Sequence, residues 1–99
     1  MARGENIISD GYVKLYTGNT CSACVTLKNT LARLNLTDYT ECDIADDHHR
    51  DAILALGHRS IPVLVRYDYL HSVCDSMGGA NSEDVQYTDF FDFRFNEAT

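Results

Sequence analysis

Along residues 12–57 the hydrophobic positions follow two patterns in turn, one with the period of a strand and one with that of a helix. Tyr12–Thr17 is rich in β-branched and aromatic residues and precedes Gly18, which predicts a first strand that ends in a loop. Apolar residues then recur at steps of three and four, which predicts an amphipathic helix beginning near Cys21. The apolar positions of this helix are Cys24, Leu27, Leu31 and Leu34.

The middle of the chain repeats this order. Residues 39–44 alternate between two faces, which predicts a second strand with Cys42 and Ile44 on the same face. Residues 46–57 begin with two aspartates, carry an apolar stripe formed by His49, Ile53 and Leu56, and end in a glycine, as expected of a second helix. Residues 61–65 are apolar throughout and contain the only proline near their start, which predicts a buried third strand.

The last third of the chain predicts a hairpin and a helix. Residues 69–74 are expected to pair as a fourth strand with the third, around a turn at Asp68, before Gly78 and Gly79 interrupt the chain. Residues 81–84 offer capping groups and first-turn acids for a third helix. Its predicted stripe is Val85, Thr88, Phe91 and Phe95, although the phenylalanines at 91, 93 and 95 also alternate as in a strand.

The predicted elements form an α/β chain, β-α-β followed by β-β-α, with the helix at 46–57 between the two halves. A chain of 99 residues can bury a core without disulfide bonds. We expect residues 1–10 to be a flexible N-terminal lead and residues 11–99 to form one domain. Neither a signal peptide nor an apolar membrane span is evident, and we therefore expect a cytoplasmic protein without membrane contact.

The charge of the chain is acidic. Fifteen acidic residues against eight basic ones give a formal net charge of −7, and the acids recur along the whole chain. This balance disfavours nucleic-acid binding and favours partners with a basic docking face. It identifies no particular partner.

Two cysteines three positions apart, Cys21 and Cys24, are the candidate reaction centre. At this spacing on the first turn of a helix they can close a disulfide with little movement of the backbone. Cys24 lies on the predicted buried stripe, whereas Cys21 precedes the helix, where free backbone N–H groups and the helix dipole favour a thiolate. We therefore expect Cys21 to be the nucleophile, with a pKa below the free value of about 8.5, and Cys24 to resolve the mixed disulfide.

Other interpretations of the cysteines are weaker. A zinc site needs further ligands at suitable spacing, and no second pair of this kind exists, so no metal is expected. A purely structural disulfide would close a very short loop and would stabilise the fold little. We expect Cys42 and Cys74 to be small buried apolar residues.

Four short stretches of the chain resemble, in order and spacing, the landmarks of glutaredoxins and of the related NrdH-type redoxins. The resemblance covers roughly residues 12 to 95 and implies a thioredoxin fold, β-α-β-β-β-α, with a central four-stranded mixed sheet flanked by helices. The stretches are Tyr16–Cys24 (YTGNTCSAC), Asp43–Asp47 (DIADD), Gly57–Leu64 (GHRSIPVL) and Gly78–Ser82 (GGANS).

The resemblance implies a thiol-disulfide oxidoreductase that reduces protein or glutathione mixed disulfides. Pro62 would be a cis-proline whose loop faces the two cysteines, and Arg59 would meet the glycine carboxylate of glutathione. We expect a monomer, with disulfide-containing proteins as substrates and glutathione as reductant or co-substrate. The residues expected to contact substrate or glutathione are Thr20, Ser22, Ala23, Arg59, Ile61, Pro62, Gly78, Gly79, Asn81 and Ser82.

Departures from the glutaredoxin pattern keep two alternatives open. Gly18 stands where glutaredoxins usually carry a lysine, and Ser22-Ala23 replaces the common Pro-Tyr, which favours an NrdH-type donor to ribonucleotide reductase that is reduced by thioredoxin reductase. Ser22 in place of proline also leaves room for an iron–sulfur carrier that binds a cluster through Cys21 and glutathione. The segment 66–77 is longer than the usual hairpin and is either a docking element or a neutral insertion.

Overall fold

A computed structural model of the chain describes residues 11–68, 70–80 and 82–91. The elements alternate as the hydrophobic pattern predicts, including the helix expected over residues 46–57, and their order is β-α-β-α-β-β-α. They are β1 (Tyr12–Thr17), α2 (Ser22–Arg33), β2 (Tyr39–Asp43), α3 (Asp47–Ala55), β3 (Val63–Tyr67), β4 (Val73–Gly78) and α4 (Asp84–Phe91).

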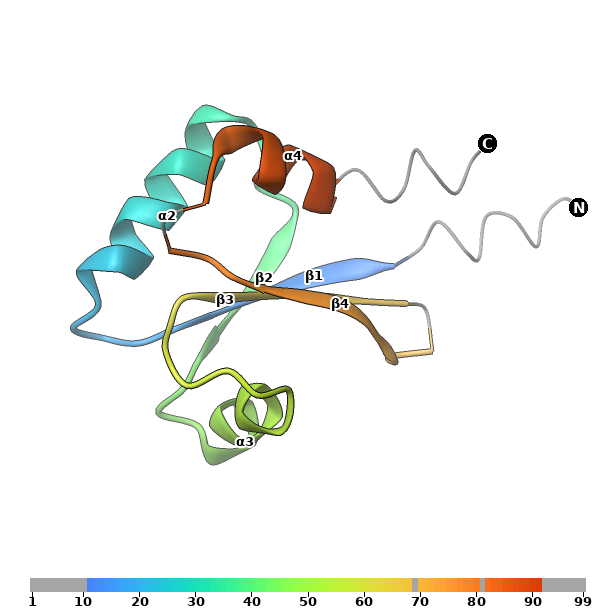
Figure 1. Ribbon diagram of the computed structural model, residues 1–99. Coiled ribbons are helices and arrows are strands. Elements are labelled where there is room, and N and C mark those ends of the chain that lie inside the picture. The colour runs from blue at the N-terminus through green and yellow to red at the C-terminus, as the bar shows by residue number, and fades with distance from the viewer. Residues whose placement is uncertain (1–10, 69, 81, 92–99) are drawn as a thin grey trace, which may run out of the picture.

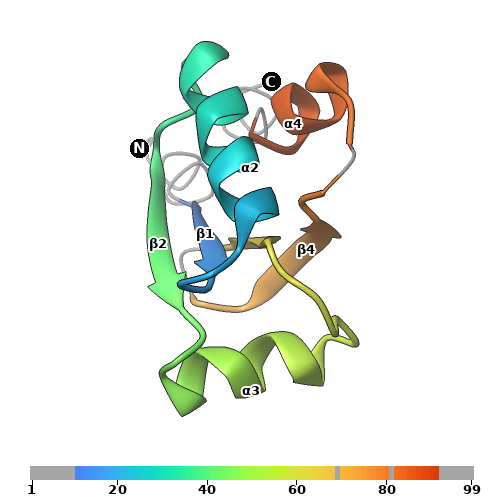
Figure 2. The same ribbon diagram turned by 90° about the vertical axis from the view of Figure 1, so that its left-hand side faces the viewer.

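The four strands form one mixed sheet in the order β2-β1-β3-β4. β1 is parallel to β2 and antiparallel to β3, and β3 is antiparallel to β4. Figure 1 shows α2 and α4 on one face of this sheet and α3 on the other. Seen from the side in Figure 2, α3 runs across the direction of α2, below the end of the sheet at which α2 begins.

Each face of the sheet has its own core, because successive side chains of a strand point to opposite faces. On β1, Val13 and Leu15 pack with α2 and α4, whereas Tyr16 packs with α3. The first core consists of Val13, Leu15, Leu27, Leu31, Leu64, Tyr87 and Phe90. The second consists of Tyr16, Cys42, Ile53, Val63, Val65 and Tyr67.

The ends of the helices are fixed by capping groups. Cys21 is the N-cap of α2, and its sulfur accepts a hydrogen bond from the backbone N–H of Cys24. Asp46 caps α3 through a carboxylate that accepts from the N–H of His48. Gly57, at φ 88°, follows the end of α3, a conformation that a residue without a side chain adopts easily.

The fourth strand was expected four residues too early. The carboxylate of Asp68 accepts hydrogen bonds from the N–H groups of Leu70 and Ser72, and the N–H of Asp68 donates to Ser72 O at 2.9 Å. This wide turn, with His71 at φ 66°, takes up the residues that the alternating pattern assigns to a strand, so that β4 begins at Val73. The segment 66–77 is thus a hairpin.

Cys74 is exposed, and the prediction that it is buried was wrong. Val73 pairs with Tyr67 and Asp75 pairs with Arg66, so that Cys74 occupies a β-bulge without a partner in the register. The bulge lies on an edge strand of the sheet. The same prediction is confirmed for Cys42, which is buried, and burial raises the pKa of its thiol.

The buried face of α4 also differs from the expected one. Tyr87 and Phe90 are buried, whereas Val85 and Thr88 are exposed. The hydroxyl of Tyr87 donates to the carbonyl of Gly79, and this contact, with the ion pair of Asp84 described below, sets the rotation of the helix. Phe93 and Phe95 lie outside the described residues. None of the described helices is long and apolar enough to cross a membrane.

Candidate active site

A disulfide joins Cys21 and Cys24 across the first turn of α2, with their Cα atoms 5.2 Å apart. The two sulfurs have different surroundings, as the sequence predicts. Cys24 is 1% exposed and belongs to the buried face of the helix, whereas Cys21 is only half-buried. The backbone N–H of Cys24 lies 3.0 Å from the sulfur of Cys21, a position from which it stabilises negative charge there when the pair is reduced.

The loop before β3 faces this disulfide. The carbonyl oxygen of Ile61 lies 4.0 Å from the Cys21 sulfur, and the peptide bond between Ile61 and Pro62 is cis, as the resemblance implies. Pro62 is fully buried. The cis-proline loop therefore places a backbone carbonyl next to the half-buried sulfur.

A cleft of about 670 Å³ opens beside Cys21, and we call it the disulfide cleft. Its lining includes Thr20, Ser22, Ala23 and Ile61, four of the residues expected to contact substrate. Two charged side chains, Asp43 and Arg50, also line it. The remaining lining residues are Gly18, Asn19, Cys21, Ile44, Ala45 and Ser60.

Arg50 was not singled out from the sequence, and Arg59 was. Arg50 lies on α3 and pairs with Asp47 one turn earlier at 2.8 Å, yet it also borders the disulfide cleft. Arg59 does not line the cleft itself but an adjoining, largely apolar hollow of about 180 Å³, whose lining shares Ile44, Arg50, Ser60 and Ile61 with the cleft. Arg59 was chosen as the cation of the site because it lies close to Pro62 in the sequence. Arg50 is far from Pro62 in the sequence, and only the packing of α3 beneath the loop brings it to the cleft.

A second hollow, the helix groove, lies between α2 and α4 and measures about 330 Å³. Ser22 and Ala23 line both this groove and the disulfide cleft, so that the two meet at the residues between the cysteines. Gly79 and Ser82, also expected at the site, line the groove. Asn81 lies outside the described residues.

The two glycines at the end of β4 differ in their surroundings. The N–H of Gly79 donates to Pro62 O at 2.7 Å, and a methyl group added at Gly79 would lie 2.5 Å from a side-chain carbon of Leu27. A methyl group added at Gly78 would meet nothing within 4 Å. Gly79 is therefore required by packing against the cis-proline loop, whereas Gly78 faces open space.

Behind Cys24 lies a polar cluster that sequence reasoning missed. Glu41 on β2 accepts a hydrogen bond from the Thr17 hydroxyl at 2.8 Å and pairs with Lys28 of α2 at 3.0 Å. The Thr17 hydrogen bond, and then Lys28, lower the pKa of the Glu41 carboxyl. These three residues and Cys24 line one hollow, and the parallel pairing of β1 with β2 brings the cluster together.

Metal-ligating side chains do not gather at this site or elsewhere in the part of the chain that the structure describes. Within residues 11–68, 70–80 and 82–91, no group of three or more histidine, cysteine or acidic side chains is arranged to hold a metal ion.

Comparison with known proteins agrees with this geometry. The family described as Glutaredoxin matches residues 13–68, more than half of the chain. The chain belongs to the glutaredoxin family. A glutaredoxin-family protein whose two cysteines form a disulfide at the start of a helix is a thiol-disulfide oxidoreductase. A comparison with curated protein sequences finds no match.

Solved structures show the thioredoxin fold. A thioredoxin-fold protein from Helicobacter pylori superposes with a TM-score of 0.66 at 15% identity, over 93% of this chain and 78% of that one. A mutant thioredoxin from Halobacterium salinarum gives 0.64 at 16% identity, over 95% and 84%. A disulphide isomerase from Xylella fastidiosa gives 0.57 at 20% identity, over 91% and 81%.

Proposed function

We propose that this glutaredoxin-family protein reduces disulfides between proteins, or between proteins and glutathione, through the dithiol of Cys21 and Cys24. The observation that carries the proposal is the asymmetry of the pair: a half-buried sulfur at the start of α2 borders an open cleft, and its partner is 1% exposed. An accessible nucleophile with a protected second thiol suits a two-step exchange.

The exchange moves two electrons. The Cys21 thiolate attacks one sulfur of a substrate disulfide, forming a Cys21–substrate disulfide while the other substrate sulfur leaves as a thiolate and takes a proton from water. Cys24, once deprotonated, attacks the Cys21 sulfur and releases the second substrate thiolate. The substrate gains two electrons, the pair returns to the disulfide, and an external reductant must then restore the dithiol.

Glutathione is the reductant expected of a glutaredoxin, and the site gives it partial support. Gly79 and Ser82, both expected to contact glutathione, line the helix groove that meets the disulfide cleft, and Arg50 offers a cation at the cleft. Arg59, the cation expected from the sequence, lines the adjoining hollow, which Arg50 also lines. We propose glutathione as co-substrate on this basis, for a monomer that acts in the cytoplasm.

An NrdH-type donor, reduced by thioredoxin reductase and serving ribonucleotide reductase, is the second candidate. Two packing observations favour it. A side chain at position 18 would begin 2.8 Å from the end of the Ile61 side chain, so that the lysine usual in glutaredoxins would require Ile61 to shift. The close packing of Gly79 against Leu27 and Pro62 already explains a glycine at this position, without any need for a glutathione site.

The deciding experiment is turnover of a small glutathione mixed disulfide with NADPH. Wild type and Cys21→Ser are compared in two systems, glutathione with glutathione reductase, and thioredoxin reductase alone. Turnover by wild type in the glutathione system only is the expected result, and turnover with thioredoxin reductase only would assign the protein to the NrdH type. Turnover in neither system, or a coloured and dimeric protein that indicates an iron–sulfur cluster, would contradict the proposal.

A further inference from the structure

The helix groove is continuous with the reaction centre. Ser22 and Ala23, which separate the two cysteines, line the groove as well as the disulfide cleft. Their side chains are small, so that nothing bulky stands between the two hollows. A chain that places a sulfur against Cys21 can therefore extend from one hollow into the other.

The α2 side of the groove presents hydroxyl groups at regular spacing. Ser22, Thr26 and Thr30 follow one another at steps of four and share one side of the helix. Within the described part of the chain, the hydroxyls of Thr26 and Thr30 make no hydrogen bond. Together with Ala80 and Ser82 on the opposite wall, these side chains favour a hydrogen-bonding main chain over a large apolar group.

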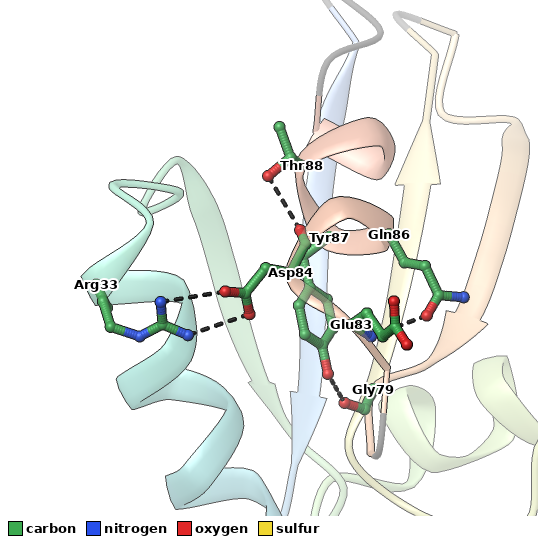
Figure 3. A network of polar contacts seen from close by, with 7 residues as sticks. All are labelled: Arg33, Gly79, Glu83, Asp84, Gln86, Tyr87 and Thr88. Atoms are coloured by element: carbon green, nitrogen blue, oxygen red, sulfur yellow. Dashed lines mark hydrogen bonds and ion pairs between the residues drawn. The ribbon is translucent and has the colours of Figure 1, made fainter.

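Two contacts join α4 to its neighbours along the helix groove. The guanidinium of Arg33, at the end of α2, donates two hydrogen bonds of 3.1 Å to the carboxylate of Asp84, at the start of α4. The hydroxyl of Tyr87, three residues after Asp84 and on nearly the same side of α4, donates to the carbonyl of Gly79. Figure 3 shows both contacts holding the first turn of α4, one towards α2 and one towards the glycine.

The length of the groove selects its occupant. Thr30 lies eight residues beyond Ser22, a distance of about 12 Å along the helix axis. Glutathione carries one residue on each side of its cysteine, whereas crossing about 12 Å takes roughly four residues of extended chain. We propose that the helix groove binds an extended segment of a protein substrate next to its reactive cysteine, an inference that rests on the proposed disulfide reduction.

Substitution of Thr30 by arginine tests this inference. Thr30→Arg places a long side chain in the far end of the groove, and Asn29→Arg is the matched control, because Asn29 is exposed on the same helix and lines neither the groove nor the disulfide cleft. Both variants add one positive charge. Each protein is reduced, freed of reductant and mixed with insulin, glutathione disulfide or 2-hydroxyethyl disulfide, and oxidation of its dithiol is followed by acid quench and mass spectrometry.

We expect Thr30→Arg to lower the insulin rate, relative to the glutathione disulfide rate, by about fivefold or more, because a clash at the groove's far end affects only a long segment. Asn29→Arg should leave this ratio within about twofold of wild type. An unchanged ratio in Thr30→Arg, or an equal or larger loss with glutathione disulfide, would overturn the inference. Failure of wild type to react with any of the three disulfides would instead refute the proposed reduction itself.

Discussion

At the scale of single residues, the two active cysteines differ because the start of a helix is asymmetric. Cys21 stands outside the helix as its N-cap, and Cys24 faces the first core one turn later. The backbone N–H of Cys24, which the Cys21 sulfur caps, is therefore also the group that stabilises charge on Cys21. Cys21 thus sets both the start of α2 and the site of nucleophilic attack.

This asymmetry predicts which substitution traps an intermediate. In a Cys74→Ser background, which removes the exposed thiol, Cys24→Ser should accumulate a mixed disulfide on Cys21 because nothing resolves it. Cys21→Ser should lower the turnover rate by about a thousandfold or more, since it removes the nucleophile. Non-reducing mass spectrometry after mixing with glutathione disulfide checks both. An adduct on Cys24 in the Cys21→Ser protein would reverse the two assignments.

Glu41 gives a residue-scale prediction for stability against pH. Its pKa is lowered in the folded state by the Thr17 hydroxyl and then by Lys28, so the unfolded state binds its proton more tightly. The stabilisation is therefore fully present above the unfolded pKa and is lost as pH falls through the folded pKa. Because the side chain is 42% exposed, we expect Glu41→Gln to lower the free energy of unfolding at pH 7 by less than about 1 kcal/mol.

Urea unfolding of wild type and Glu41→Gln between pH 7 and pH 3 measures this difference, which should shrink as the pH falls through the acid range. Glu83→Gln serves as the control, because Glu83 is an exposed carboxylate outside the cluster of Thr17, Lys28 and Glu41. A difference that grows as the pH falls would show that the Glu41 pKa is raised.

At the scale of elements, the sequence predicted most of the fold. β1, α2, β2 and α3 carry clear periodic patterns, and their residues pair and pack as expected. The errors fall where local hydrogen bonds compete with the pattern. The carboxylate of Asp68 forms a wide turn that delays β4. Contacts of Asp84 with Arg33 and of Tyr87 with Gly79 hold α4 in a rotation that differs from the stripe that spacing alone indicates.

The junction between β4 and α4 gives a prediction at this scale. A methyl group at Gly79 would crowd the buried Leu27 and the backbone carbonyl of Pro62, at 2.5 and 3.2 Å, whereas the same group at Gly78 would meet nothing. We expect Gly79→Ala to lower the free energy of unfolding by about 1–3 kcal/mol. Gly78→Ala should change it little or raise it by up to about 1 kcal/mol, because alanine restricts the unfolded chain.

Thermal and urea unfolding of the two alanine variants, side by side, decide this point, with each serving as the other's control. Equal losses in both would mean that the glycine pair serves backbone conformation and not the close approach of Gly79 to Leu27 and Pro62.

At the scale of the whole molecule, the sequence predicted the charge but not its placement. The net charge of −7 follows from composition alone. Which cation reaches the disulfide cleft depends on how α3 packs under the sheet, and this packing brings Arg50 to the cleft, while Arg59 lines only the adjoining hollow. Likewise, the helix groove depends on the Arg33–Asp84 pair between distant segments, which no local pattern indicates.

The net charge predicts how disulfides of opposite charge should compete. Pre-reduced protein should react faster with the cationic disulfide cystamine than with the anionic 3,3′-dithiodipropionate, because an acidic surface attracts cations and repels anions. We expect a ratio of about 3 to 10 at low ionic strength, corrected for the rates of the same disulfides with a neutral small thiol. Salt at about 0.5 M should reduce this ratio towards one, since screening acts over a few ångströms there. If the corrected ratio stays constant as salt is added, local contacts at Asp43 and Arg50, and not the charge of the whole molecule, determine the preference.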